Sequence, residues 1–142
     1  MKDIHHSVHD YPHKDRLIKE TIEFSKTERY VNAVYGQMFF TKVDKFFLDL
    51  VKRYKLGSGI GIIRTHFLRP GGDHATGHAH GVDTGVYYLQ IPENSGDLFF
   101  LKDDIMIKAQ VDHFVVVPAN AIHGVSENKS NELRIALAFD IL

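Results

Sequence analysis

Cysteine is absent from the 142-residue sequence, which excludes disulfide bonds, thiolate metal sites and cysteine nucleophiles. Histidine and carboxylate side chains therefore remain as the plausible metal ligands, and the chain has ten histidines. An excess of charge of either sign is also absent, because 17 basic residues stand against 18 acidic ones. We therefore expect neither nucleic acid nor a membrane surface as a partner.

Long apolar runs are absent as well. No segment approaches the roughly 20 apolar residues that span a bilayer, and residues 1–15 contain no apolar core of signal-peptide length. We therefore expect a cytoplasmic protein. With 44% hydrophobic and 25% charged residues, the chain has the composition of a single globular domain. Within it we expect an N-terminal helical segment over residues 1–57 and a core over residues 58–142.

Helical periodicity marks the segment from Thr41 to Tyr54, where apolar residues recur at intervals of three and four. Thr41, with Asp44 three residues later, is an acceptable N-terminal cap, and basic residues before Gly57 suit the other end. A second helix is expected from about Asp15 to Ser25. Four histidines precede it in a polar segment that we interpret as a loosely ordered terminus. They are His5, His6, His9 and His13.

After Gly59 the pattern changes to short apolar runs that are separated by turn residues. The expected strands are Ile60 to Leu68, Gly85 to Ile91, Asp97 to Leu101, Ile105 to Ala109, His113 to Pro118, Ile122 to Ser126 and Leu133 to Ile141. Close spacing without intervening helices favours an antiparallel sandwich or barrel over βαβ units. The N-terminal helices would then pack on the outside of one sheet.

The segment GDHATGHAHGVD, from Gly72 to Asp83, concentrates histidines and aspartates before an aromatic run. His78 and His80 are two residues apart, so both side chains project from one face if the segment is extended. His123, at the start of a later strand, is placed to be a third ligand. Three histidines leave coordination positions open on a metal such as Fe(II), which is where substrate or oxygen would bind.

An isolated histidine is usually a solvated or hydrogen-bonded residue. We interpret His66, His74 and His113 in this way, although His66 could face the same cavity. The paired spacing of His78 and His80, together with the later histidine, favours a metal site over that interpretation.

The last expected strand has two different faces. Leu133, Ile135, Leu137 and Phe139 alternate with Arg134, Ala136, Ala138 and Asp140. One interpretation is that the second set is a solvent face. Alanine is not a usual choice for an exposed strand face, however, and small residues beside an arginine leave room for a ligand carboxylate.

These motifs occur in the order HAH, VYYLQIPENSGDL, VVVPANAIHGV and RIALAF. Together they resemble the double-stranded β-helix of the Fe(II)- and 2-oxoglutarate-dependent oxygenases, and the resemblance covers about Ile60 to Leu142. It implies a mainly β jelly-roll fold, and an enzyme that hydroxylates a small-molecule or peptide substrate.

The resemblance also implies roles for individual residues. His78, His80 and His123 would bind Fe(II), with Asp83 as an alternative to His80 because the family usually has an acidic ligand there. Arg134 would bind the distal carboxylate of 2-oxoglutarate, and Tyr88 is a further candidate for the same co-substrate. No catalytic residue is expected beyond the metal site.

The same residues resemble the cupins, which share the jelly roll. On that alternative the three histidines would bind Fe(II), Zn(II), Mn(II) or Ni(II) in a dioxygenase or isomerase that needs no 2-oxoglutarate. A third alternative is a jelly roll that binds small molecules without catalysis.

A homodimer that forms through an exposed sheet edge is also expected.

Overall fold

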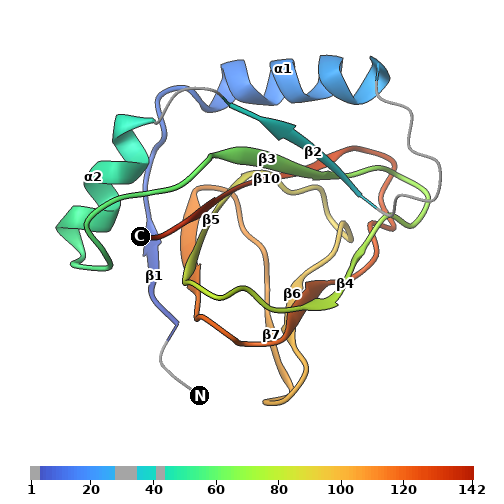
Figure 1. Ribbon diagram of the computed structural model, residues 1–142. Helices are drawn as coiled ribbons and strands as arrows, with labels where there is room; N and C mark the ends of the chain where they lie inside the picture. The colour runs from blue at the N-terminus through green and yellow to red at the C-terminus, as the bar shows by residue number, and fades with distance from the viewer. Residues whose placement is uncertain (1–3, 28–34, 41–43) are drawn as a thin grey trace.

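The computed structural model describes residues 4–27, 35–40 and 44–142, which form two antiparallel sheets and two helices (Figure 1). In chain order the elements are β1 (His6–Val8), α1 (Lys14–Thr27), β2 (Gly36–Phe39), α2 (Lys45–Arg53), β3 (Arg64–Leu68), β4 (Ala75–His78), β5 (Thr84–Gln90), β6 (Leu98–Phe100), β7 (Ile105–Ile107), β8 (His113–Val117), β9 (His123–Val125) and β10 (Arg134–Asp140).

The larger sheet has the strand order β1-β8-β5-β10-β3-β2, and the smaller sheet has the order β4-β9-β6-β7. From β3 onward the chain passes back and forth between the two sheets, so that strands distant in sequence become neighbours. This antiparallel winding is the jelly roll that the strand spacing predicted. The prediction of a mainly β fold with helices outside one sheet is therefore confirmed.

Strand β10 lies at the centre of the larger sheet, between β5 and β3. Its bulky residues Ile135, Leu137 and Phe139 belong to the main hydrophobic core, which lies between this sheet and the helices. Its small residue Ala136 belongs to the second apolar cluster, on the face toward the smaller sheet. The alternation that was read from the sequence therefore separates a packed outer face from an inner face with room for a ligand.

The two helices cover the outer face of the larger sheet, as Figure 1 shows for α1 above β2 and β3. Helix α2 contributes Phe47, Leu50 and Val51 to the core, and α1 contributes Leu17. Asp44 caps α2, because its carboxylate accepts a hydrogen bond of 2.9 Å from the backbone N–H of Phe46. The start that was predicted at Thr41 lies outside the described residues.

Three short strands were not anticipated from the sequence. β1 and β2 lie within the segment that was expected to be helical, and they form the two edges of the larger sheet. β4 runs through the histidine-rich segment and pairs with β9. Neither described helix has the length and apolar character needed to cross a membrane.

Candidate metal centre

His78 and His123 face each other across the smaller sheet. His78 is the last residue of β4, His123 is the first residue of β9, and the two are directly paired in the sheet register. Their ring centroids are 4.5 Å apart. The side chains therefore meet because of strand pairing, which holds their backbones at a fixed spacing.

Both rings are also held in one orientation. The Nδ1 of His78 lies 2.8 Å from the carbonyl oxygen of Thr76, and the Nδ1 of His123 lies 2.8 Å from that of Ala121. A carbonyl oxygen only accepts hydrogen bonds, so each Nδ1 must donate its proton. The Nε2 lone pair of each neutral imidazole then remains free for a metal, which is the usual arrangement of metal-binding histidines.

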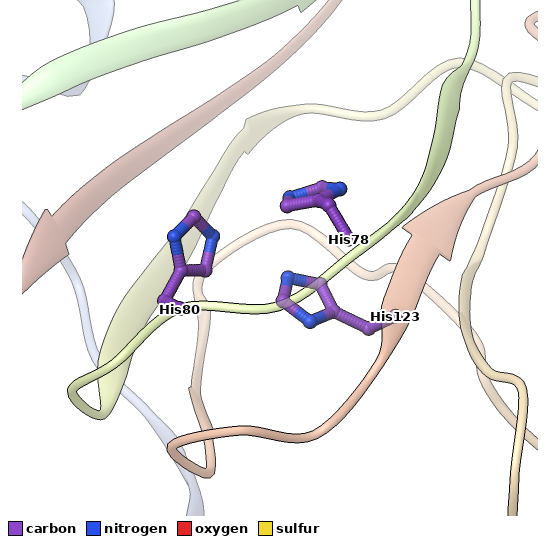
Figure 2. A group of neighbouring side chains, drawn as sticks. All are labelled: His78, His80 and His123. Carbon is purple, nitrogen blue, oxygen red and sulfur yellow. The ribbon is translucent and has the colours of Figure 1, made fainter.

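His80 reaches the same place from a loop, because β4 ends at His78. Its ring centroid lies 5.0 Å from that of His78 and 5.3 Å from that of His123. The backbone carbonyl of His80 accepts a hydrogen bond of 2.7 Å from Asn120, which lies in the loop before β9. Figure 2 shows the three rings facing a common space. The extended conformation that would place His78 and His80 on one face thus ends at His78, although the side chain of His80 meets the other two.

The three imidazoles form a donor group that suits a borderline metal ion. One nitrogen from each ring lies within 4.8 Å of the others. Bonds of about 2.1 Å to one ion need nitrogen separations of about 3.0–3.4 Å, so the rings would have to rotate toward one another to bind it. Burial lowers the pKa of His80 and of His123, and this favours the neutral form that a metal requires.

Asp83, the alternative to His80, lies outside this group of three. Its Oδ1 accepts a hydrogen bond of 2.7 Å from the backbone N–H of Ala119, and its carbonyl accepts one of 2.9 Å from Ile141. Asp83 therefore joins the loop that carries His80 to the loop that leads to His123. Its role in the structure is to hold together the loop of His80 and the loop that precedes His123.

This role predicts different results for two substitutions of Asp83. In Asp83→Asn the amide oxygen still accepts from Ala119, so we expect metal affinity to stay within about threefold of the native value. In Asp83→Ala the bond is lost, at a cost of about 1–2 kcal/mol, and we expect affinity to fall about tenfold. Calorimetric titration with Zn(II) measures both variants. A large loss in Asp83→Asn would instead identify the carboxylate as a ligand.

A cavity of about 130 Å³ lies between the sheets, and the three histidines form part of its wall. Arg134 also lines it and is only 1% exposed. Its Nε donates a hydrogen bond of 3.3 Å to the carbonyl of Gly96, and its Cζ lies 5.5 Å from the centroid of the Tyr88 ring. Within the described residues its Nη2 has no hydrogen-bond partner. Burying a guanidinium without a carboxylate partner costs free energy of folding, and a bound ligand that carries a carboxylate would offset this cost.

Tyr88 and Thr84 line the same cavity from β5. The hydroxyl of Thr84 is buried and, among the residues described, has no partner. Burial raises the pKa of Tyr88, so its hydroxyl stays protonated. The structure therefore brings together all the residues that were expected to bind metal or co-substrate, with the exception of Asp83.

His66, interpreted from the sequence as an ordinary polar residue that could face the cavity, does line it from β3, and so does Arg64, which was not anticipated. His66 is half-buried, and its ring lies against that of Tyr35 in a tilted arrangement at a centroid distance of 4.2 Å. Alternation along the expected strand of residues 60–68 was the available signal. It was not sufficient alone, because the sequence does not say which face of that strand points inward.

His66 makes the stability of the fold dependent on pH. Burial, reinforced by Arg134 and Arg64, lowers the pKa of His66 from 6.5 to about 3. Below pH 6.5 the unfolded chain therefore binds a proton at His66, whereas the folded protein keeps this imidazole neutral until the pH approaches 3. Its contribution to stability is complete above pH 6.5 and is lost as pH falls from 6.5 toward 3.

We expect the free energy of unfolding to fall over that range by up to about 1.4 kcal/mol per pH unit from this residue. Urea unfolding at a series of pH values measures the slope, which should be shallower in His66→Gln. His13→Gln is the control, since His13 is exposed on the surface. Equal slopes in the native protein and in His66→Gln would contradict this assignment.

The remaining histidines lie elsewhere, as their interpretation as ordinary polar residues predicted. His74 hydrogen-bonds through Nδ1 to the carbonyl of Gly72 at 3.1 Å and is not part of the group of three. His113 contacts the ring of His6 across the pairing of β1 with β8. The N-terminal segment is more ordered than expected, because His6 lies in a strand.

No protein-family model and no curated protein matches the chain. Solved structures do resemble it. The viral collagen prolyl hydroxylase of Paramecium bursaria Chlorella virus-1, in its 2OG complex, superposes with a TM-score of 0.77 at 15% identity, covering 99% of this chain and 95% of that one. A prolyl-4-hydroxylase of Pseudomonas putida gives 0.68 at 15% identity, covering 97% and 91%.

A cupin superfamily protein from Desulfitobacterium hafniense gives a TM-score of 0.53 at 19% identity, covering 83% of this chain and 85% of its own. At such identities the likeness shows the fold. The chain has the jelly-roll fold that is common to these prolyl hydroxylases and cupins, as the sequence resemblance implied.

Proposed function

We propose that this protein is an Fe(II)- and 2-oxoglutarate-dependent oxygenase. The observation that carries the proposal is the buried, incompletely partnered guanidinium of Arg134 in the cavity that the three histidines line. Binding a metal ion to the three histidines would not by itself require a buried arginine that lacks a carboxylate partner. The likeness to prolyl hydroxylases, one of them in complex with 2OG, supports the same activity.

In the proposed reaction a C–H bond, O₂ and 2-oxoglutarate give an alcohol, succinate and CO₂. The iron would supply the coordination sites at which O₂ and the 2-oxo acid are activated. His78, His80 and His123 would hold it and would leave coordination positions open for O₂ and the 2-oxo acid. The protein's own contribution is to orient these partners and to exclude water.

Arg134 would bind the distal carboxylate of the co-substrate. The planar fork of a guanidinium suits bidentate binding of a carboxylate, and low exposure strengthens the attraction. Ala136 and Ala138 follow on the same face of β10 and leave space in the cavity. The protonated hydroxyl of Tyr88 and the unpaired hydroxyl of Thr84 would be further hydrogen-bond donors.

Anaerobic titration tests this function. Fe(II) is added first and 2-oxoglutarate second, and we expect a weak visible charge-transfer band from chelation of the 2-oxo acid, then succinate after O₂ is admitted. 2-Oxobutyrate, which lacks the distal carboxylate, is the matched control and should require a much higher concentration. Fe(II) binding without a band or succinate would refute the proposal.

The three-histidine donor set supports a second candidate, because no carboxylate belongs to the group. A cupin-type dioxygenase or isomerase would use the metal directly on its substrate. The likeness to a cupin superfamily protein agrees with this candidate. It predicts that 2-oxoglutarate has no effect on O₂ consumption and that Arg134 is dispensable.

A further inference from the structure

The cavity contains a second arginine at some distance from Arg134. Arg64 lies on β3 next to β10, opposite Ala138, whereas Arg134 lies opposite Leu68. Both arginines line the same cavity. Four residues of strand separate these two positions, which corresponds to about 13 Å. The inner face of the sheet thus has a cation near each end.

The guanidinium of Arg64 points away from Arg134. Arg134 is held by the carbonyl of Gly96. The Nη1 of Arg64 lies 3.5 Å from the carbonyl of Ile62 and 3.9 Å from the Oδ1 of Asp140, and both of these residues lie farther along the strands, away from Arg134. A five-carbon dicarboxylate spans roughly 6 Å, judged from its C–C bond lengths. One molecule of 2-oxoglutarate therefore does not reach both arginines.

Arg64 is incompletely paired. A separation of 3.9 Å is longer than a hydrogen bond, and the side chain of Asp140 is 45% exposed, so the attraction between them is screened. The side chain of Arg64 itself is 16% exposed. Its Nε and Nη2 make no hydrogen bond to any residue in the described part of the chain. Several N–H donors of a largely buried cation thus remain available to a ligand.

An exposed aromatic ring lies beside this cation. Phe39 is directly opposite Arg64 in the pairing of β2 with β3, so both side chains are on the same face of the sheet. The ring is 62% exposed, because β2 is an edge strand. Arg64 and Phe39 together offer an anion-binding group next to an apolar surface.

We propose that Arg64 binds a carboxylate of the substrate that is oxidised, and that Phe39 contacts an apolar group of the same molecule. The substrate class is then a small carboxylic acid with an aliphatic or aromatic body. The inference rests on the proposed function in one respect, since that function reserves Arg134 for the co-substrate. His80 and Arg64 line the same cavity, which brings such an acid close to the histidines.

The test uses the complete protein without metal, in EDTA, with phenylacetate and its neutral isostere phenylacetamide as probes. Binding is followed by ligand-observed NMR. We expect phenylacetate to bind at least tenfold more tightly than phenylacetamide, because a charge-assisted pair distinguishes them. Arg64→Gln should remove that preference, and Asp140→Asn should increase it by removing the competing carboxylate. Phe39→Ala should weaken both probes by a similar factor.

Arg134 is vacant in this assay because 2-oxoglutarate is absent, so its guanidinium can also attract the probe. All variants are therefore made on Arg134→Gln, which should by itself keep the preference for phenylacetate. The inference is overturned if phenylacetate does not bind, if the amide binds equally well, or if the preference survives in a folded Arg64→Gln protein. Loss of the preference in Arg134→Gln alone overturns it as well. Because the assay contains neither metal nor 2-oxoglutarate, failure of the proposed oxygenase reaction does not alter its outcome.

Discussion

Replacing Arg134 by glutamine is expected to weaken 2-oxoglutarate binding by about 100-fold or more, while the protein without ligand folds at least as stably as before. The first effect follows from loss of a bidentate, charge-assisted pair inside the cavity. The second follows from removal of a cation that is 1% exposed and whose Nη2 has no partner within the described residues. Burial already lowers the pKa of Arg134, which indicates that its charged form is disfavoured there.

Two measurements separate these effects. Calorimetric titration of the metal-loaded protein gives the affinity for 2-oxoglutarate, and thermal unfolding of the metal-free protein gives the stability. Arg53→Gln is the control, because Arg53 is exposed in the last turn of α2. Affinity for 2-oxobutyrate should be unchanged in Arg134→Gln. A stable variant that retains native affinity for 2-oxoglutarate would exclude the co-substrate role of Arg134.

His78→Ala and His123→Ala are each expected to lower metal affinity by at least 100-fold. Both residues lie on paired strands, and both rings have Nδ1 fixed by a backbone carbonyl, so each delivers Nε2 at little entropic cost. His80→Ala should have a smaller effect. The backbone carbonyl of His80 accepts a hydrogen bond from Asn120, but within the described chain its ring makes no hydrogen bond. The ring is therefore less firmly oriented than those of His78 and His123.

His74→Ala is the matched control for these substitutions. His74 makes the same Nδ1 contact to a carbonyl two residues earlier and lies on the approach to β4, but it is not part of the group of three. Metal content after purification and competition with a chelator measure all four variants. If His78→Ala and His123→Ala retain the ion while His74→Ala loses it, the metal centre lies elsewhere.

The parts of the fold that could be predicted are those with strong local patterns. The amphipathic stripe of α2 and the two-sided alternation of β10 are visible within ten or so residues, and the structure has both. β1 and β2 have three and four residues and form only by pairing with β8 and β3. Strands that depend on distant partners carry little local signal.

In the candidate site, too, residues with a local sequence signal could be predicted, and residues positioned by distant segments could not. The spacing of His78 and His80 and the sequence around His123 were sufficient to select the three histidines as candidates. Choosing between His80 and Asp83 was not possible, because the choice depends on the hydrogen bond from Ala119, which is 36 residues away. Arg64 was missed for a related reason. Only the pairing of β3 with β10 brings it into the cavity.

The division of β10 into two faces has a consequence for how this protein tolerates change. Arg134, Ala136 and Ala138 line the cavity, whereas Ile135, Leu137 and Phe139 pack under the helices. Substituting one of the three cavity-lining residues therefore alters what is bound and leaves the folding core in place. Inserting or deleting one residue would exchange the two sets, moving Phe139 and Leu137 into the cavity and Arg134 under a helix. Variation in substrate choice should therefore proceed through replacements in β10, and length changes should be confined to the loops.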